Sequence, residues 1–148
     1  MENREIEILL VEDNLNDAEF TIRAFQKFNV GNRLVHLKNG AEALEFFFGS
    51  ADSPGFYSGS RLKLILLDLK MPKVDGIQVL ERLKSSELTK KIPVVVLTSS
   101  REDPDIERCY QLGINSYIVK PVDFQKFTEA MKMIGMYWLM LNRPPCVE

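Results

Sequence analysis

The sequence has few of the features that disulfide-rich, zinc-binding or membrane proteins need. It has one histidine, and its two cysteines, Cys109 and Cys146, form no C-x-x-C pair, so we expect two reduced thiols in a cytoplasmic protein. No apolar run approaches the ~18 residues of a membrane-spanning helix, and the polar start MENREIE is not a secretory signal. The net charge of -2 disfavours general attraction to nucleic acid or to a membrane surface.

Hydrophobic residues make up 45% of the 148 residues, which suffices for the core of one domain. Strand-like and helix-like patterns alternate along the chain. The expected strands lie at 6–11, 33–37, 63–68, 93–98 and 115–119. The expected helices lie at 14–28, from a cap at Asn39 onward, and at about 75–84, 103–112 and 123–141. The stretch 49–61 is rich in Gly, Ser and Pro and is typical of a surface loop. This alternation predicts an α/β fold, a doubly wound five-stranded parallel sheet with helices on both faces.

Polar residues stand where four of these strands end. Glu12 and Asp13 follow the first strand, Asp68 ends the third, Thr98 the fourth, and Lys120 follows the fifth. The carboxyl ends of parallel strands meet at one edge of the sheet, where ligands bind. Crowded carboxylates need a cation or raised pKa values, and a purely oxygen-based ligand set suits Mg²⁺. With a lysine and a hydroxyl group nearby, the set suits phosphoryl transfer, in which a carboxylate can be the nucleophile.

Each of these residues, taken singly, has an ordinary structural explanation. An acid pair after a strand can cap a helix, an aspartate can cap a turn, and a lysine is usually a surface charge. The ordered set at successive strand ends favours a functional site. A nucleotide-binding loop is excluded because neither glycine-rich phosphate motif occurs. A hydrolase of the haloacid dehalogenase type is disfavoured because Lys70 stands where that class needs a second acid.

The stretches ILLVEDN, LILLDLKMPKVDG, PVVVLTSS and YIVKPVD occur in this order along the chain. In type, order and spacing the chain resembles the receiver domain of two-component response regulators over nearly its whole length. The resemblance implies a flavodoxin-like sheet of strand order 2-1-3-4-5. It also implies a Mg²⁺-dependent reaction in which Asp68 accepts a phosphoryl group from a histidine kinase.

The resemblance further implies a metal site and a switch. The expected Mg²⁺ ligands are Asp13, Asp68, the backbone carbonyl of Lys70 and, directly or through water, Glu12. Lys120 would pair with the phosphoryl oxygens, and Thr98 and Tyr117 would move together when the group is attached. The Lys120–Pro121 peptide bond is expected in cis.

We expect a single receiver domain over 1–148, with a core of about 5–141, a tail at 142–148 and no output domain. The loop 49–61, the extension YWLMLNRPP and Asp17 after VEDN resemble the small stand-alone response regulators that partner phytochromes. A phytochrome-type histidine kinase is therefore the expected partner. An alternative stays open at this point: a degenerate receiver that acts as a phosphorylation-independent binding module.

The last predicted helix has two apolar faces. The face expected to cover the sheet comprises Phe124, Phe127, Met131, Ile134, Trp138 and Leu141. A second series comprises Ala130, Met133, Tyr137 and Met140, and at ~100° per residue it lies roughly 110° around the helix. A neighbouring helix or a folded-back tail could cover it. We expect instead a homodimer with Met133, Tyr137 and Met140 in its interface.

Overall fold

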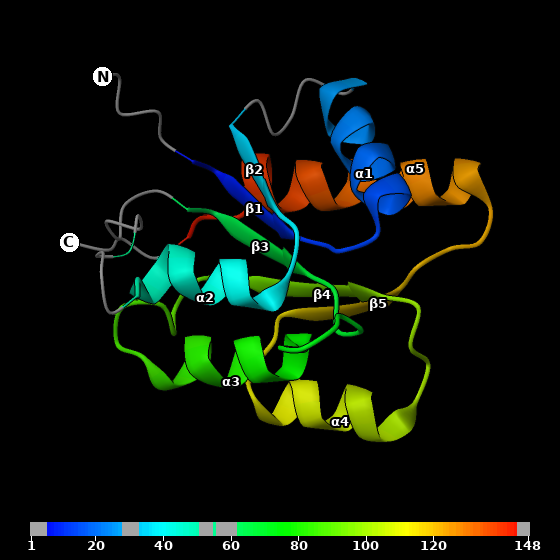
Figure 1. The fold of residues 1–148 in the computed structure, drawn as a ribbon. Coiled ribbons are helices and arrows are strands. Elements are labelled where there is room, and N and C mark those ends of the chain that lie inside the picture. Colours follow the sequence, from blue (N-terminus) through cyan, green and yellow to red (C-terminus); the bar gives the residue numbers. More distant parts are fainter. Residues whose placement is uncertain (1–5, 28–32, 51–54, 56–61, 145–148) are drawn as a thin grey trace.

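The predicted parallel sheet is confirmed by the computed structural model, which describes residues 6–27, 33–50, 55 and 62–144. Its strand order is β2-β1-β3-β4-β5 (Figure 1). The strands are β1 (Ile8–Val11), β2 (Leu34–Leu37), β3 (Leu64–Leu67), β4 (Val94–Thr98) and β5 (Ser116–Val119). Most of the expected 49–61 loop, the last four residues of the expected tail and Cys146 lie outside the described residues.

The three central strands are apolar apart from Thr98 at the end of β4, because helices cover both of their faces. Every residue of β1, β3 and β4 is buried, whereas every residue of the edge strands β2 and β5 is half-buried. Ile8 of β1 pairs in register with Leu34 on one side and with Leu64 on the other. Such continuous apolar runs are typical of parallel strands inside α/β proteins.

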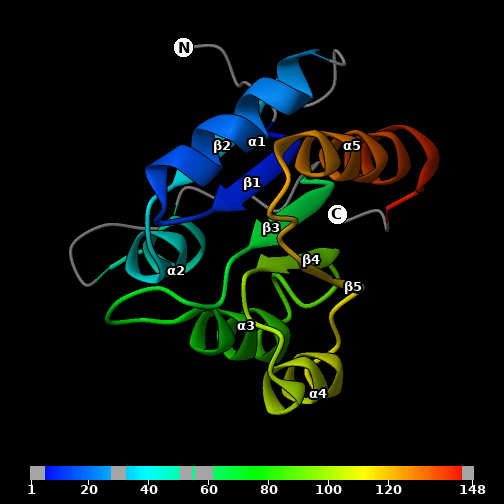
Figure 2. The same ribbon diagram turned by 90° about the vertical axis from the view of Figure 1, so that its right-hand side faces the viewer.

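Helices cover the sheet in two layers. α1 (Leu15–Lys27) and α5 (Phe124–Gly135) lie on one face, and α2 (Gly40–Phe48), α3 (Gly76–Ser85) and α4 (Asp103–Gln111) lie on the other (Figures 1 and 2). Alternate strand residues divide between two cores, with Leu9 and Ile65 in one and Ile8 and Leu64 in the other. Of the helices in the described part of the chain, none is both long enough and apolar enough to cross a membrane.

The last helix departs from the prediction. A continuous helix over 123–141 was expected, but α5 ends at Gly135 and a π-helical segment, η1 (Met136–Leu141), follows. The wider π turn changes the angular spacing of side chains, and Leu141 is exposed instead of covering the sheet. Phe124, the first residue of α5, is exposed too. Its ring does not cover the sheet but packs edge-on against Phe20 of α1, with 5.0 Å between the ring centroids. Phe127, Met131 and Ile134 are buried as expected.

At Gly76, the first residue of α3, the helix approaches the backbone that follows β3 closely. Asp75 caps α3 in a capping box with Gln78, and the N–H of Gly76 donates to the carbonyl of Leu69 at 2.9 Å. A Cβ atom at Gly76 would collide with the carbonyl oxygen of Asp68 and would lie 2.7 Å from the Cα of Leu69. The absence of a side chain therefore lets the first turn of α3 pack directly against the backbone of Asp68.

We expect Gly76→Ala to lower the free energy of unfolding by about 1–3 kcal/mol, because the new methyl group forces backbone apart where nothing flexible can yield. Chemical denaturation measures this. Ser85→Ala, an exposed position at the end of the same helix, should stay within about 0.5 kcal/mol of wild type. Equal stability of the two variants would show that the close approach at Gly76 is not required.

Candidate functional site

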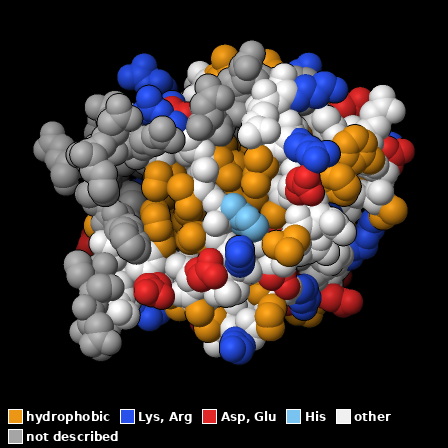
Figure 3. Space-filling model, turned by 45° about the horizontal axis from the view of Figure 1, so that its top comes forward, with side chains coloured by type: hydrophobic (Ala, Val, Ile, Leu, Met, Phe, Trp, Pro, Cys, Tyr) orange, Lys and Arg blue, Asp and Glu red, His pale blue; other side chains and the backbone are white. Residues whose placement is uncertain are grey.

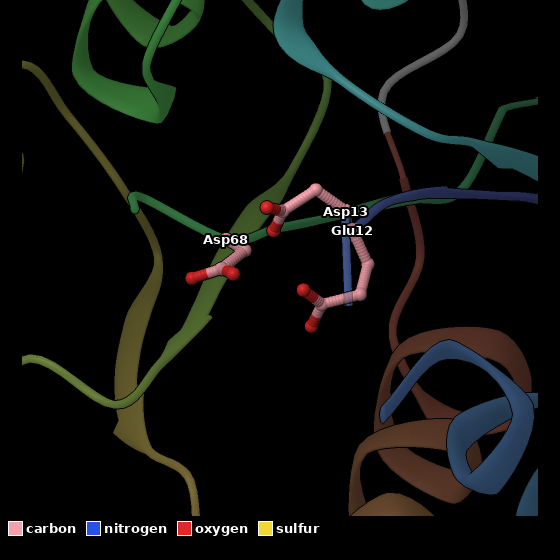
Figure 4. A group of neighbouring side chains, drawn as sticks. All are labelled: Glu12, Asp13 and Asp68. Atoms are coloured by element: carbon pink, nitrogen blue, oxygen red, sulfur yellow. The ribbon is translucent and has the colours of Figure 1, made fainter. Parts of the chain in front are cut away.

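The residues expected to form one site do lie together at the carboxyl edge of the sheet. Glu12 and Asp13 extend from the end of β1 and Asp68 from the end of β3, and one carboxylate oxygen of each lies within 4.8 Å of the others (Figure 4). Glu12 and Asp68 are buried, and Asp13 is half-buried. Adjacent parallel strands β1 and β3 end at the same level, which places the three carboxylates side by side.

Lys120 supplies the positive charge of the site, as the strand-end argument predicted. Its Nζ lies 2.6 Å from Oε1 of Glu12, 2.8 Å from Oδ2 of Asp17 and 3.4 Å from Oδ2 of Asp68. The Lys120 side chain is only 10% exposed. Asp17 was missed as a site residue because it stands in the first turn of α1 and not at a strand end. In the sequence, Asp17 had been noted only as a feature of the resemblance to phytochrome-partner regulators, four residues after Asp13, and no role in the site had been given to it.

Burial and crowding shift the pKa values of Glu12 and Lys120. Desolvation and the neighbouring Asp68 raise the pKa of Glu12 to about 8, against the opposing effect of Lys120. Burial by itself lowers the pKa of Lys120, but its hydrogen bonds to Asp17 and Glu12 and the charges of Asp68 and Glu12 shift it upward overall. Lys120 thus keeps its positive charge, while burial and the neighbouring Asp68 favour the protonated form of Glu12.

Lys70 contributes its backbone to the site, while its side chain turns toward α4. Its N–H donates to Oδ1 of Asp68 at 3.4 Å, and its Nζ pairs with Oδ2 of Asp105 at 3.1 Å. This pairing raises the pKa of Lys70. The same oxygen of Asp105 accepts the hydroxyl of Ser100 at 2.7 Å. Lys70 therefore connects the strand end of Asp68 to the first turn of α4.

The two expected switch residues, Thr98 on β4 and Tyr117 on β5, both contact Ser100 in the loop between β4 and α4. Thr98 is fully buried, and its hydroxyl oxygen accepts the N–H of Ser100 at 3.3 Å. The half-buried Tyr117 on β5 donates its hydroxyl to the carbonyl of Ser100 at 3.0 Å. Both residues thus contact Ser100, which the sequence reasoning did not single out.

One further sequence expectation has a clear outcome. The Lys120–Pro121 peptide bond was expected in cis, but the described residues contain no cis peptide, so this expectation is wrong for the structure. The Lys120 N–H instead donates to the carbonyl of Thr98 at 2.7 Å and continues the sheet pairing into the loop. The side chain of His36 contacts the backbone of the site, because its Nε2 lies 2.7 Å from the carbonyl oxygen of Glu12. Its ring reaches the surface among hydrophobic side chains (Figure 3).

The residues present fit a hard divalent cation. Glu12, Asp13 and Asp68 offer carboxylate oxygens only, and such donors suit Mg²⁺. These three carboxylates lie together, and the ammonium of Lys120 contacts two of them, Glu12 and Asp68. A cation held by these carboxylates would relieve the remaining repulsion.

Comparison with known proteins identifies the family. The model of the response regulator receiver domain matches residues 8–132. The probable methanogenesis regulatory protein FilR2 of Methanothrix harundinacea is 40% identical over 142 residues, which cover 93% of this chain and 86% of that protein. Response regulator Rcp1 of Synechocystis sp. is 35% identical over 133 residues, covering 89% and 88%.

Solved structures agree with these relatives. The phosphorylated cyanobacterial phytochrome response regulator RcpA superimposes with a TM-score of 0.84 at 35% identity, covering 96% of this chain and 99% of that one. The Mn²⁺-bound form of Rcp1 superimposes with a TM-score of 0.83 at 34% identity, covering 95% and 99%. The flavodoxin-like fold and the similarity to phytochrome response regulators, both expected from the sequence, are confirmed.

In metal-free protein, we expect the free energy of unfolding to fall as pH rises from about 4.5 to about 8. Folded Glu12 keeps its proton in this interval, whereas unfolded Glu12 releases it. The resulting stabilisation is fully present below pH 4.5 and is lost as pH rises through about 8. Urea titrations in chelator at several pH values measure the slope. In Glu12→Gln, whose side chain cannot ionise, the free energy of unfolding should depend less on pH. If it falls with pH equally in the two proteins, the raised pKa of Glu12 is contradicted.

Proposed function

Because the chain belongs to the response regulator receiver family, we propose that it is a stand-alone regulator that accepts a phosphoryl group on Asp68 from a histidine kinase. The observation that carries this proposal is the place of Asp68. It is 5% exposed at the end of β3, with Glu12 and Asp13 on one side and the ammonium of Lys120 at 3.4 Å. A carboxylate held between acids that can bind a cation and a fixed positive charge is suited to attack phosphorus.

In the proposed reaction, a carboxylate oxygen of Asp68 forms a bond to phosphorus as the bond from phosphorus to the kinase imidazole breaks. The imidazole leaves with the electron pair and becomes neutral histidine. Lys120 pairs with the phosphoryl oxygens, and Thr98 and Tyr117 respond from the adjoining loop. Glu12, Asp13, Asp68 and the carbonyl of Lys70 would hold Mg²⁺, which would neutralise charge on the transferred group. The chain itself acts as a signalling module that assists its own phosphorylation and dephosphorylation.

An exposed apolar patch beside the site supports docking of a kinase. We define the α1–α5 patch as Leu15, Phe20, Val122 and Phe124. Leu15 begins α1 just after the acid pair, and Val122 follows Lys120 by two residues and is 98% exposed. The edge-on contact of Phe20 with Phe124 joins the two helices. Exposed apolar side chains on segments that adjoin a reactive group give a partner helix a surface to cover.

The proposed kinase is of the phytochrome type, in the cytoplasm. The supporting observation is that RcpA, named as a phytochrome response regulator, covers almost the whole chain. FilR2, named for methanogenesis, favours a second candidate, a histidine kinase of another input class. Transfer from purified phytochrome kinase, compared with transfer from a small phosphodonor, separates these candidates.

We also propose that the chain forms a homodimer through α5 and η1. Met133, Tyr137 and Met140 are 70%, 52% and 67% exposed. Met133 and Tyr137 also line a groove, together with Ile134 and Trp138 of the last helical segments and with Asn115, Ser116 and Ile118 at and just before β5. Because β5 is an edge strand, a second copy of the chain can cover this groove together with the exposed side chains of Met133, Tyr137 and Met140. Neither a nucleic acid nor a membrane is a proposed partner.

Asp68→Asn tests the phosphoacceptor. The change is nearly isosteric, so the fold should persist, but the amide cannot form an acyl phosphate. We expect loss of acid-stable, base-labile label from acetyl phosphate with Mg²⁺, while Asp103→Asn, an exposed acid of α4, labels like wild type. Label at the wild-type level on Asp68→Asn would refute the assignment. Absence of label on wild type would favour the phosphorylation-independent binding module.

Tyr137→Ala combined with Met140→Ala tests the dimer. The double variant should sediment as a monomer at concentrations where wild type is a dimer, since a buried aromatic anchor can contribute ~2 kcal/mol or more to an interface. Leu15→Ala combined with Phe20→Ala removes exposed apolar surface from α1 and should leave the dimer intact. A monomeric wild type, with and without a phosphoryl mimic, would exclude the dimer.

A further inference from the structure

The ammonium of Lys120 contacts three carboxylates, which come from different parts of the fold. Its Nζ donates to Oδ2 of Asp17 at 2.8 Å and to Oδ2 of Asp68 at 3.4 Å, and forms an ion pair with Oε1 of Glu12 at 2.6 Å. Glu12 and Asp68 belong to the acid group that can hold a metal ion, whereas Asp17 does not. Asp17 therefore acts on the site through Lys120.

The start of α1 holds Asp17 in place. Its N–H donates to Oδ1 of Asn14 at 3.0 Å, and its carbonyl accepts the hydroxyl of the buried Thr21 at 2.8 Å. The first turn of a helix also favours a negative side chain. Its carboxylate thus approaches Lys120 from a helix, on a support independent of the strand ends that carry Glu12 and Asp68.

We propose that Asp17 is a positioning residue that keeps Lys120 at the border of the acidic site. If Glu12 and Asp68 turn their oxygens toward a bound cation, Asp17 is the carboxylate that retains Lys120 within reach of Asp68. Without the charge of Asp17, Lys120 pairs more closely with Glu12 and Asp68 and opposes metal binding. The position of Lys120 is then controlled by a residue outside the acid group that can hold the metal. The biological meaning of this role rests on the proposed function.

A double-mutant cycle on Mg²⁺ affinity tests the proposal. Calorimetric titrations compare wild type, Asp17→Asn, Lys120→Met and the double variant. Asp17→Asn should raise the Kd of Mg²⁺ about threefold to tenfold, the range for a partly shielded carboxylate–ammonium pair. In the Lys120→Met background the same change should alter Kd less than about twofold. Asp17→Glu should restore much of the affinity.

Glu19→Gln is the matched control, because it removes one negative charge from the same helix where the partner is Arg23, at 2.6 Å. Its Mg²⁺ affinity should equal that of wild type. If Lys120→Met unfolds, nuclear magnetic resonance of the Lys120 ammonium replaces the cycle: Asp17→Asn should speed proton exchange at Nζ, and Glu19→Gln should not.

Two results would overturn the proposal. An equal rise in Kd with and without Lys120 would mean that Asp17 acts through space, and an unchanged Kd in Asp17→Asn would mean that it has no effect on the site. Neither measurement needs phosphorylation. If wild type takes no label at Asp68 while the cycle shows coupling, the proposed function fails and the role of Asp17 stands. If wild type is labelled normally while the cycle shows no coupling between Asp17 and Lys120, the proposed function stands and the role of Asp17 fails.

Discussion

The site depends on one buried ammonium among carboxylates. Lys120 lies within 2.6–3.4 Å of Glu12, Asp17 and Asp68, and without it three acids would meet at low dielectric with nothing to balance them. Removing one partner of such a group is costly because it leaves the others uncompensated. The same charge that stabilises the folded site in the absence of metal is placed where a phosphoryl group on Asp68 would need it.

The fold supplies this arrangement by rigid supports of two kinds. Strand ends carry Glu12, Asp68 and Lys120, and helix α1 carries Asp17. The buried strands hold their ends in register, and the bare Cα of Gly76 lets α3 press against the backbone of Asp68. Precision at the site is therefore a consequence of close packing on both faces of the sheet.

A continuous set of contacts leads away from Asp68 on its other side. The backbone of Lys70 binds Asp68, its side chain binds Asp105 in α4, and Asp105 binds Ser100. Ser100 also accepts the hydroxyl of Tyr117 on β5. A change of charge at Asp68 thus has physical neighbours in α4 and in β5, and β5 also lines the groove proposed for self-association.

The sequence by itself predicted the sheet order, through family motifs, and the strand ends at which Glu12, Asp13, Asp68, Thr98 and Lys120 stand. These follow from local signals, since a buried parallel strand is a continuous apolar run and the polar residue that ends it marks the edge of the sheet.

Only the tertiary structure decided the contacts between residues that are far apart in the sequence. Asp17 and Ser100 became site residues because folding brings α1 to Lys120 and β5 to the β4–α4 loop. The turn from α5 into the π-helical η1 redirected the last side chains, and the Lys120–Pro121 bond took the trans form. Helical spacing in a sequence assumes an unbroken period of 3.6 residues, so it cannot reveal where packing widens a turn or which side chains meet across the fold.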